Sequence, residues 1–322
     1  MRRLSIDPYL LAMAATVGTA CLVPVHGIGA VVAGWAVKLA IAFLFFLYGA
    51  RLSPSAALDG LRHWQLHSVV LACTFVLFPL LGLAARVLVP NVISPQLYAG
   101  LLFLCVLPST VQSSIAFTSI ARGNVAAALC AASASNLIGI FATPLLVAAL
   151  MNTQAGFSFN VLLDIVMQLL APFLAGQVLR PWIAGFVQRH KPVLGYLDRG
   201  SILLVIYAAF SEGIVSGAWH GVAVREMLLL AVASSALLAV VMLVARGVSR
   251  LLGFSREDEI AIIFCGSKKS LASGLPMASV LFSGGQVGLV VIPLMLFHQI
   301  QLMVCAVLAQ RYAKHPQVVP AE

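Results

Sequence analysis

LPSTVQSSIAFTSIARG, residues Leu107–Gly123, is the stretch that decides the fold of this chain. An apolar run, Leu97–Val106, leads into it and predicts a membrane helix. Pro108 lacks an N–H and fixes its own φ, so a helix kinks or breaks there. Because freed backbone groups in lipid need a partner from protein or water, we expect a polar site at membrane depth. The side chains that mark it are Ser109, Thr110, Gln112, Ser113 and Ser114.

A second interrupted apolar segment, FCGSKKSLASGLP, covers Phe264–Pro276. Its candidate site residues are Ser267, Lys268, Lys269 and Ser270. Paired interrupted segments are the best sequence pointer to a transporter's binding site, so we expect the two breaks to meet mid-bilayer. Two ammonium groups beside a helix N-terminus favour an anion. Alternatively, one lysine neutralises carbonyl dipoles where another transporter would hold a metal cation.

Composition places the chain in a lipid bilayer. The 322 residues are 61% hydrophobic and 9% charged, whereas soluble domains are about 25% charged. The net charge of +9 is scattered over short loops, which argues against a nucleic-acid partner. The six cysteines lie in apolar runs and form no CxxC pair, so no metal site is predicted.

We expect an all-α membrane protein with ten transmembrane helices. Most of the 19 lysines and arginines fall on one side if both termini are cytoplasmic, as the positive-inside rule predicts. The N-terminal apolar stretch is interpreted as a retained first helix rather than a signal peptide. The expected helices are Pro8–Val25, Ile28–Ala50, Ser68–Leu88, Leu97–Ala121, Val125–Met151, Phe159–Leu179, Ser201–Trp219, Met227–Val248, Ile260–Phe282 and Val287–Gln310.

The outer loop 152–156 divides these segments into two sets of five. An odd number of spans in each half forces the halves to be inverted if they are repeats. In each half the fourth segment is the interrupted one, as in inverted-repeat secondary transporters. We therefore predict a first repeat over 1–151, a second, inverted repeat over 157–313 and a short cytoplasmic tail over 314–322.

Other polar residues at membrane depth are further candidates. Lys38 and Glu212 both reach about mid-depth, where an ion pair between them would be a gate, a proton relay or a structural link. Asp164 lies near an outer helix end, where it either lines an entrance or has no role in the site. The remaining candidates line the site or merely bond between helices, and they are Thr74, Ser133, Ser135, Asn136, His298, Gln299 and Gln301.

The quoted motifs resemble a known family. PSTVQSSIAFTSIARGNVAAA, residues 108–128, with TPLL at Thr143–Leu146, is similar to the fourth and fifth helices of the bile acid:sodium symporter family, and FCGSKKSLASGLPM to its ninth. The match is closest to the divergent symporter-like branch. The resemblance implies a core domain of segments three to five and eight to ten and a panel domain of the others. Broken helices four and nine would cross in the core, with the solute between the domains.

The resemblance also implies that the family's sodium ligands are not kept. Losing a carboxylate and gaining two ammonium groups should abolish sites for a hard cation that wants oxygen ligands. We therefore expect the symporter fold with degenerate sodium sites, in which a lysine supplies the fixed charge or itself exchanges protons. The positions that align with the family's ligands are Thr74, Ser113, Ser114, Ala128, Ala132, Phe264 or Cys265, Lys268 and Lys269.

We predict a secondary active transporter of the bacterial inner membrane that moves a small organic anion by alternating access. It would be no enzyme, because the chain has no HExxH motif and no pair of mid-helix aspartates. We expect no cofactor, while coupling to H⁺, to Na⁺ or to no ion stays open, as does the oligomeric state. The alternative is a non-transporting membrane protein that regulates ion homeostasis or partner proteins.

Overall fold

The computed structural model describes residues 8–51, 63–151, 159–217, 223–282 and 286–314, and every regular element in these ranges is a helix. The chain divides into two compact units, each made of separate stretches of sequence. Unit 1 comprises Met1–Leu52, Gln154–Ala223 and Leu275–Ile292, and unit 2 comprises Ser53–Thr153, Val224–Gly274 and Pro293–Glu322.

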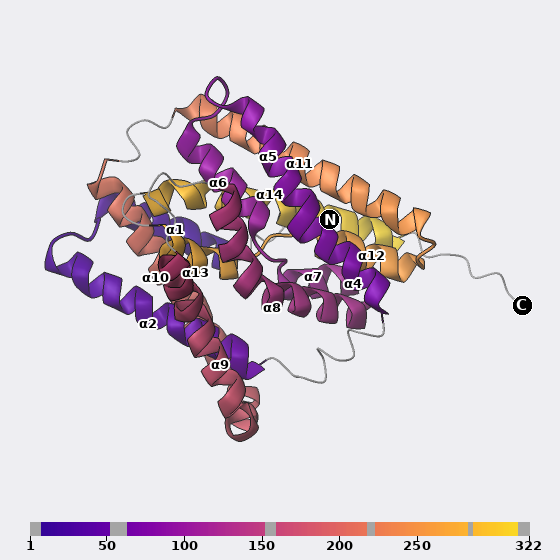
Figure 1. The fold of residues 1–322 in the computed structure, drawn as a ribbon, viewed down its shortest axis with the longest axis horizontal. Helices are drawn as coiled ribbons and strands as arrows, with labels where there is room; N and C mark the ends of the chain where they lie inside the picture. The colour runs from indigo at the N-terminus through magenta and orange to yellow at the C-terminus, as the bar shows by residue number, and fades with distance from the viewer. Residues whose placement is uncertain (1–7, 52–62, 152–158, 218–222, 283–285, 315–322) are drawn as a thin grey trace, which may run out of the picture. The chain divides into compact units, whose positions relative to one another are not determined.

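Unit 1 is built on a close helix pair, α2 and α9, which lie side by side in Figure 1. A Cβ placed on Gly49 of α2 would lie 2.0 Å from the Phe173 carbonyl oxygen, and one on Gly176 of α9 would lie 2.0 Å from the Phe46 carbonyl oxygen. The two backbones therefore touch at both glycines, which only residues without a side chain allow. The complete helices of this unit are α1 (Pro8–Leu22), α2 (Ile28–Arg51), α9 (Phe159–Arg189) and α10 (Lys191–Val215), and the stretch Leu275–Ile292 adds parts of α13 (Leu271–Leu281) and α14 (Gln286–Lys314).

Polar contacts attach α10 to this pair and to α1. Arg51, at the end of α2, forms an ion pair with Asp198 of α10. The Tyr207 hydroxyl of α10 donates to the Val23 carbonyl oxygen just after α1, at 2.8 Å. These contacts fix α10 against both α1 and α2.

Unit 2 contains both predicted breaks. The first separates α6 from α7, whose axes differ by 65°, and the second separates α12 from α13. Pro108 lies in the first break, as expected for a residue that cannot continue a helix. The elements of this unit are α4 (Trp64–Ala72), η2 (Cys73–Leu77), α5 (Phe78–Ala84), η3 (Ala85–Leu88), α6 (Pro95–Val106), α7 (Val111–Ile120), α8 (Val125–Leu150), α11 (Val224–Leu251), α12 (Arg256–Gly266) and parts of α13 (Leu271–Leu281) and α14 (Gln286–Lys314).

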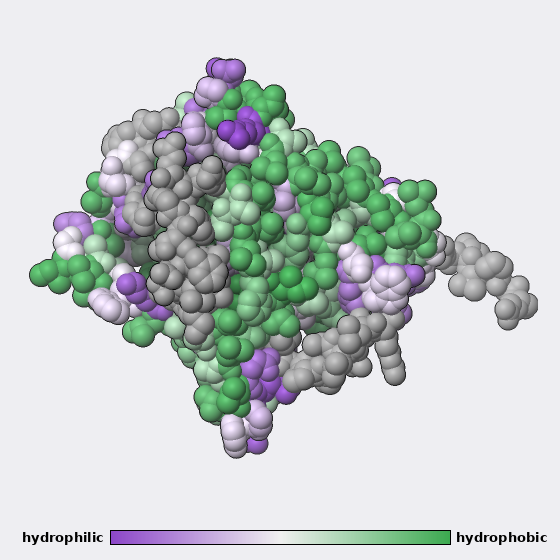
Figure 2. All heavy atoms as spheres, viewed as in Figure 1, coloured by the Kyte–Doolittle hydropathy of each residue, from purple (hydrophilic) through white to green (hydrophobic). Residues whose placement is uncertain are grey.

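Large apolar side chains cover the outer faces of several helices of unit 2. Figure 2 shows them as a continuous green area over α5, α6 and α11. Exposed members include Leu80 of α5 and Val232 and Leu243 of α11. Surfaces of this kind are stable only where lipid covers them.

The described helices support an integral membrane protein. Seven helical spans are long and apolar enough to cross a bilayer, with the consecutive α4, η2, α5 and η3 (Trp64–Leu88) counted as one, and the bent pair α6 and α7 makes up to eight. Of the other expected spans, α1 has 15 residues and α12 and α13 have 11 each, which makes them shorter than a full crossing. The all-helical membrane class is confirmed, whereas ten spans, inverted repeats and the core and panel domains stay predictions.

Candidate functional site

The two breaks of unit 2 are in direct contact. The Ser270 N–H donates to the Pro108 carbonyl oxygen at 2.9 Å, and the Thr110 hydroxyl donates to the Lys269 carbonyl oxygen at 2.9 Å. Each break thus supplies hydrogen-bond partners that the other lacks. This satisfies the requirement that backbone freed at membrane depth be paired within the protein. The predicted meeting of the two interrupted segments is therefore present in the structure.

Lys269 lies at the centre of this crossing and is completely buried. Its ammonium nitrogen donates to the carbonyl oxygens of Thr74, Cys105 and Leu107, at 2.8, 2.8 and 2.7 Å. Three donors therefore meet three acceptors, which uses the full capacity of an ammonium group. The Phe78 ring adds a cation–π contact, with its centroid 4.2 Å from the nitrogen.

The sequence of the third span explains why the Thr74 carbonyl is free. Thr74 lies in the π-helical turn η2, where the Phe78 N–H donates to the Cys73 carbonyl, five residues back instead of four. In this register the next N–H, that of residue 79, would reach Thr74. Residue 79 is a proline and has no N–H. A π-turn followed by proline therefore leaves this carbonyl for Lys269.

The other two carbonyls are free because α6 ends at the break. The N–H that would normally pair with the Cys105 carbonyl belongs to Ser109, and it donates instead to the Ser135 hydroxyl at 3.0 Å. Leu107 lies in the extended backbone after the last turn of α6. The carbonyls at a helix C-terminus carry partial negative charge, which the ammonium of Lys269 neutralises.

Lys268 is also completely buried, yet its surroundings differ entirely. Its ammonium nitrogen has no hydrogen-bond partner among the described residues. Instead it lies 4.0 Å from the centroid of the Phe117 ring and 5.7 Å from that of Phe264. The two adjacent lysines are therefore distinct: carbonyl oxygens hold Lys269, and aromatic faces hold Lys268.

Asn136 of α8 links both breaks. Its amide nitrogen donates to the Ser109 carbonyl oxygen at 2.6 Å, and its amide oxygen accepts from the Ser273 hydroxyl at 2.8 Å. The Ser270 hydroxyl donates in turn to that of Ser273 at 3.0 Å. Ser273 was not among the expected site residues, although it lies inside the second interrupted segment and one turn after Ser270.

Gln301 of α14 clamps the backbone of Lys269. The glutamine side-chain oxygen accepts from the Lys269 N–H, and its nitrogen donates to the Lys269 carbonyl oxygen, both at 3.0 Å. His298 contacts the same amide nitrogen at 2.9 Å. Gln299, on another side of the helix, is only half-buried and forms no such bond. Of the three polar residues considered in this segment, Gln301 is the one at the crossing.

The remaining candidates fall into two groups. Ser114 donates to the Phe264 carbonyl oxygen at 3.2 Å and so joins the crossing, whereas the Ser267 hydroxyl bonds within its own helix to Ile263. Two candidates, the exposed Gln112 and the half-buried Ser133, lie outside the hydrogen-bonded crossing. The hydroxyl of a third, Ser113, is buried and has no hydrogen-bond partner in the described residues.

Two ionisable candidates of unit 1, Lys38 and Glu212, are described by the structure, and they do not pair with each other. Lys38 is exposed and lies over the Trp35 ring, 4.8 Å from its centroid. Glu212 is exposed too, and within the described ranges no ion pair joins it to Lys38. The ion pair considered from mid-depth spacing is therefore not formed, because both side chains point outward. The side chain of Asp164 lies outside the described residues.

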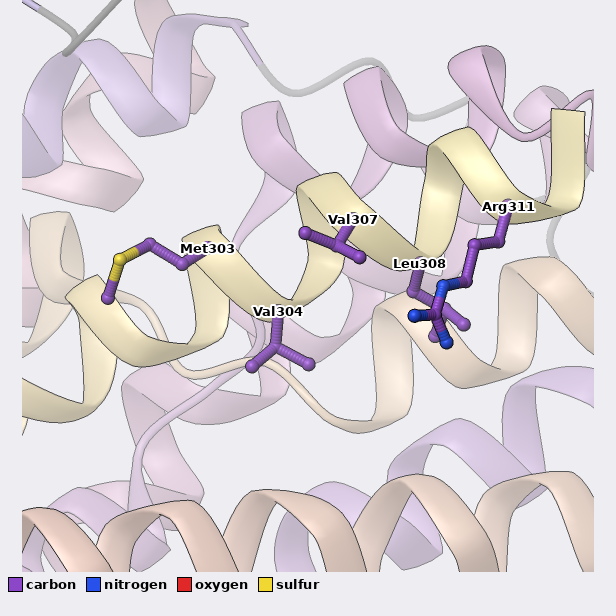
Figure 3. Close-up of a pocket in the computed structure, with 5 residues that line it drawn as sticks. All are labelled: Met303, Val304, Val307, Leu308 and Arg311. Carbon is purple, nitrogen blue, oxygen red and sulfur yellow. The ribbon is translucent and has the colours of Figure 1, made fainter. Parts of the chain in front are cut away.

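A shallow groove of about 360 Å³ follows one face of α14. Figure 3 shows four apolar side chains along it and a guanidinium group at one end. None of the candidate site residues lines this groove. Its walls have the composition of a lipid-facing helix surface that ends in a basic residue. The lining residues are Met303, Val304, Val307, Leu308 and Arg311.

Known proteins resemble this chain over most of its length. An uncharacterized protein of Pseudomonas aeruginosa is 56% identical over 310 residues, which cover 96% of this chain and 93% of the relative. YfeH of Escherichia coli K12, which its name calls a symporter, is 49% identical over 98% of this chain and 96% of its own length. Sodium/bile acid cotransporter 7 of Danio rerio is 28% identical over 84% of this chain and 82% of its own.

The match to a family model is equally extensive, since it runs over residues 7–314. It includes both broken segments and the crossing that they form. The family and the names of the relatives indicate transport across a membrane and no enzymatic activity. This chain belongs to the SBF-like CPA transporter family.

Proposed function

We propose that this transporter carries a small organic anion by alternating access and needs no sodium ion, because the Lys269 ammonium supplies the charge that a bound cation would bring. The observation that carries the proposal is the set of three backbone carbonyls around that ammonium. Converging carbonyl oxygens are what a hard monovalent cation seeks. Here a covalently attached cation already satisfies them.

The charge balance of the crossing supports an anionic solute. Two buried lysines lie there, and none of the described hydrogen bonds or ion pairs at the crossing involves a carboxylate. Glu259, the buried carboxylate of α12, is paired with Arg246 and Arg250 instead. The N-termini of α7 and α13 follow the two breaks and add positive potential. The region therefore has an excess of positive charge.

The first experiment identifies a solute and then tests its dependence on sodium. Thermal-shift screening of the purified protein with organic anions finds a ligand, since a ligand that prefers the folded state raises apparent stability. Uptake of that ligand into proteoliposomes is then measured in sodium and in choline buffers. We expect equal rates, and a pH gradient added in a second series decides whether protons are coupled. Strong, stoichiometric stimulation by sodium would refute the proposal.

A rescue experiment tests the role of Lys269 itself. Lys269→Ala removes the ammonium and leaves its three carbonyl oxygens facing a vacated space. We expect this variant to lose uptake and to regain part of it, together with thermal stability, when sodium or ammonium chloride is added. Lys268→Ala is the matched control, because Lys268 is equally buried but its ammonium holds no carbonyls. Loss of uptake without recovery by either cation contradicts a cation-like role.

A further inference from the structure

The surroundings of Lys268 are incomplete for an ammonium group. A buried ammonium ordinarily has hydrogen-bond acceptors or an anionic partner, because desolvation of an unpaired charge is costly. Lys268 has only aromatic faces, which attract a cation but accept no conventional hydrogen bond. The thiols of Cys265 and Cys305 interact electrostatically with it, and neither is a carboxylate. An anionic partner is therefore the missing element.

Phe117 contacts this buried ammonium and also reaches the surface of the protein. Its ring contacts Lys268, whereas the residue as a whole is only partly buried. Ser113 and Ile120 lie on the same face of α7, one turn before and one turn after it, and both are partly or fully exposed. The Ser113 hydroxyl has no partner either. One unpartnered polar group thus contacts the half-exposed ring, and a second lies one turn away on the same helix face.

We propose that Phe117 is a movable cover and that Lys268, once uncovered, pairs with the carboxylate of the transported solute. This assignment rests on the proposed transport of an organic anion, and it gives the two lysines different roles. Lys269 stays with its carbonyls, and Lys268 exchanges an aromatic face for the solute. The Ser113 hydroxyl supplies a donor at the same opening.

The geometry favours movement of this ring over movement of Lys269. Opening the cover breaks one cation–π contact and one ring contact, with Phe264 at 6.1 Å between centroids. Releasing Lys269 would break three charge-assisted hydrogen bonds. An apolar ring on the solute could replace that of Phe117 against Phe264. The best probe is therefore a carboxylate that carries a phenyl ring, such as benzoate.

Amine-selective acetylation followed by peptide mass spectrometry tests the cover in the full-length protein. We expect little acetylation of either lysine in the native protein. Phe117→Ala should raise acetylation of Lys268 by about tenfold, the factor that follows from losing roughly one cation–π contact. Phe117→Leu keeps the bulk and should resemble the native protein. Lys269 should remain unmodified throughout, which also shows that the variants are folded.

Benzoate and its neutral analogue benzamide test the pairing. In Phe117→Ala, benzoate should protect Lys268 from acetylation and benzamide should not. Benzoate should also raise the melting temperature of the native protein and of Lys268→Arg, which keeps the charge, but not that of Lys268→Met.

Three results would overturn the inference: unchanged acetylation in Phe117→Ala, equal protection by both probes, or benzoate stabilisation that persists in Lys268→Met. Each would leave sodium-independent uptake untouched, so the inference and the proposed function can fail separately. Sodium-driven uptake with Lys268 still protected by benzoate would instead refute the proposed function alone.

Discussion

Replacing Lys269 with methionine is the sharpest test of the structure. Methionine has nearly the same length and fills the same space, but it has no donor for the carbonyls of Thr74, Cys105 and Leu107. All three oxygens would remain buried without the partner that they now have. The variant therefore removes hydrogen bonds and charge with little change in volume.

The structure sets the size of the effect. A buried acceptor left without a partner costs about 1–3 kcal/mol, so three of them cost about 3–9 kcal/mol. The whole free energy of unfolding of a typical domain is about 5–15 kcal/mol. Lys269→Met should therefore lose much of its stability or fail to fold. The stability of Lys269→Arg should fall between that of the native protein and that of Lys269→Met, because a planar guanidinium cannot aim three donors from one point.

Lys268→Met is the matched control for this prediction. Lys268 is the neighbouring residue and is just as buried, but its nitrogen has no hydrogen-bond partner in the part of the chain that the structure describes. Removing it sacrifices two cation–π contacts and relieves an unpaired buried charge. We expect a change within about 1 kcal/mol in either direction.

Denaturant titration of the purified proteins in detergent micelles measures all four stabilities under one condition. Far-ultraviolet circular dichroism establishes beforehand that each variant is helical. The reasoning is wrong if Lys269→Met unfolds at the native midpoint, or if Lys268→Met loses as much stability as Lys269→Met.

Two further predictions follow from backbone contacts. Gly176→Ala should destabilise the protein by about 3 kcal/mol or more, because its Cβ would meet the Phe46 carbonyl oxygen at 2.0 Å. Gly185→Ala in the same helix should be neutral or stabilising, since nothing lies within 4 Å of its Cβ. Thermal unfolding compares the two variants, and equal effects would contradict the close helix contact. Pro79→Ala restores an N–H that can reach the Thr74 carbonyl. By itself it should lower the free energy of unfolding by about 1 kcal/mol, but combined with Lys269→Met it should recover part of the stability that Lys269→Met loses. Purely additive changes in the free energy of unfolding would show that this carbonyl is not shared.

Sequence reasoning located the helix interruptions because their causes are local. Pro108 cannot continue a helix, and a short polar run between apolar segments marks the second break. The same reasoning failed where a side chain's direction mattered. Lys38 and Glu212 are at similar depth by residue count, yet both point outward and do not pair. The depth of a residue in the membrane can be counted along the chain, whereas the direction in which its side chain points depends on helix rotation and packing.

The sequence by itself determined an all-helical membrane protein with two polar breaks. Only the tertiary structure decided that Lys268 and Lys269, neighbours with identical chemistry, have different surroundings. Lys269 reaches a carbonyl freed by a π-turn and a proline 195 residues earlier in the chain, while Lys268 faces two aromatic rings. A hydrogen-bond acceptor is chosen by proximity in space, and no pattern within either segment specifies which distant carbonyl lies within reach.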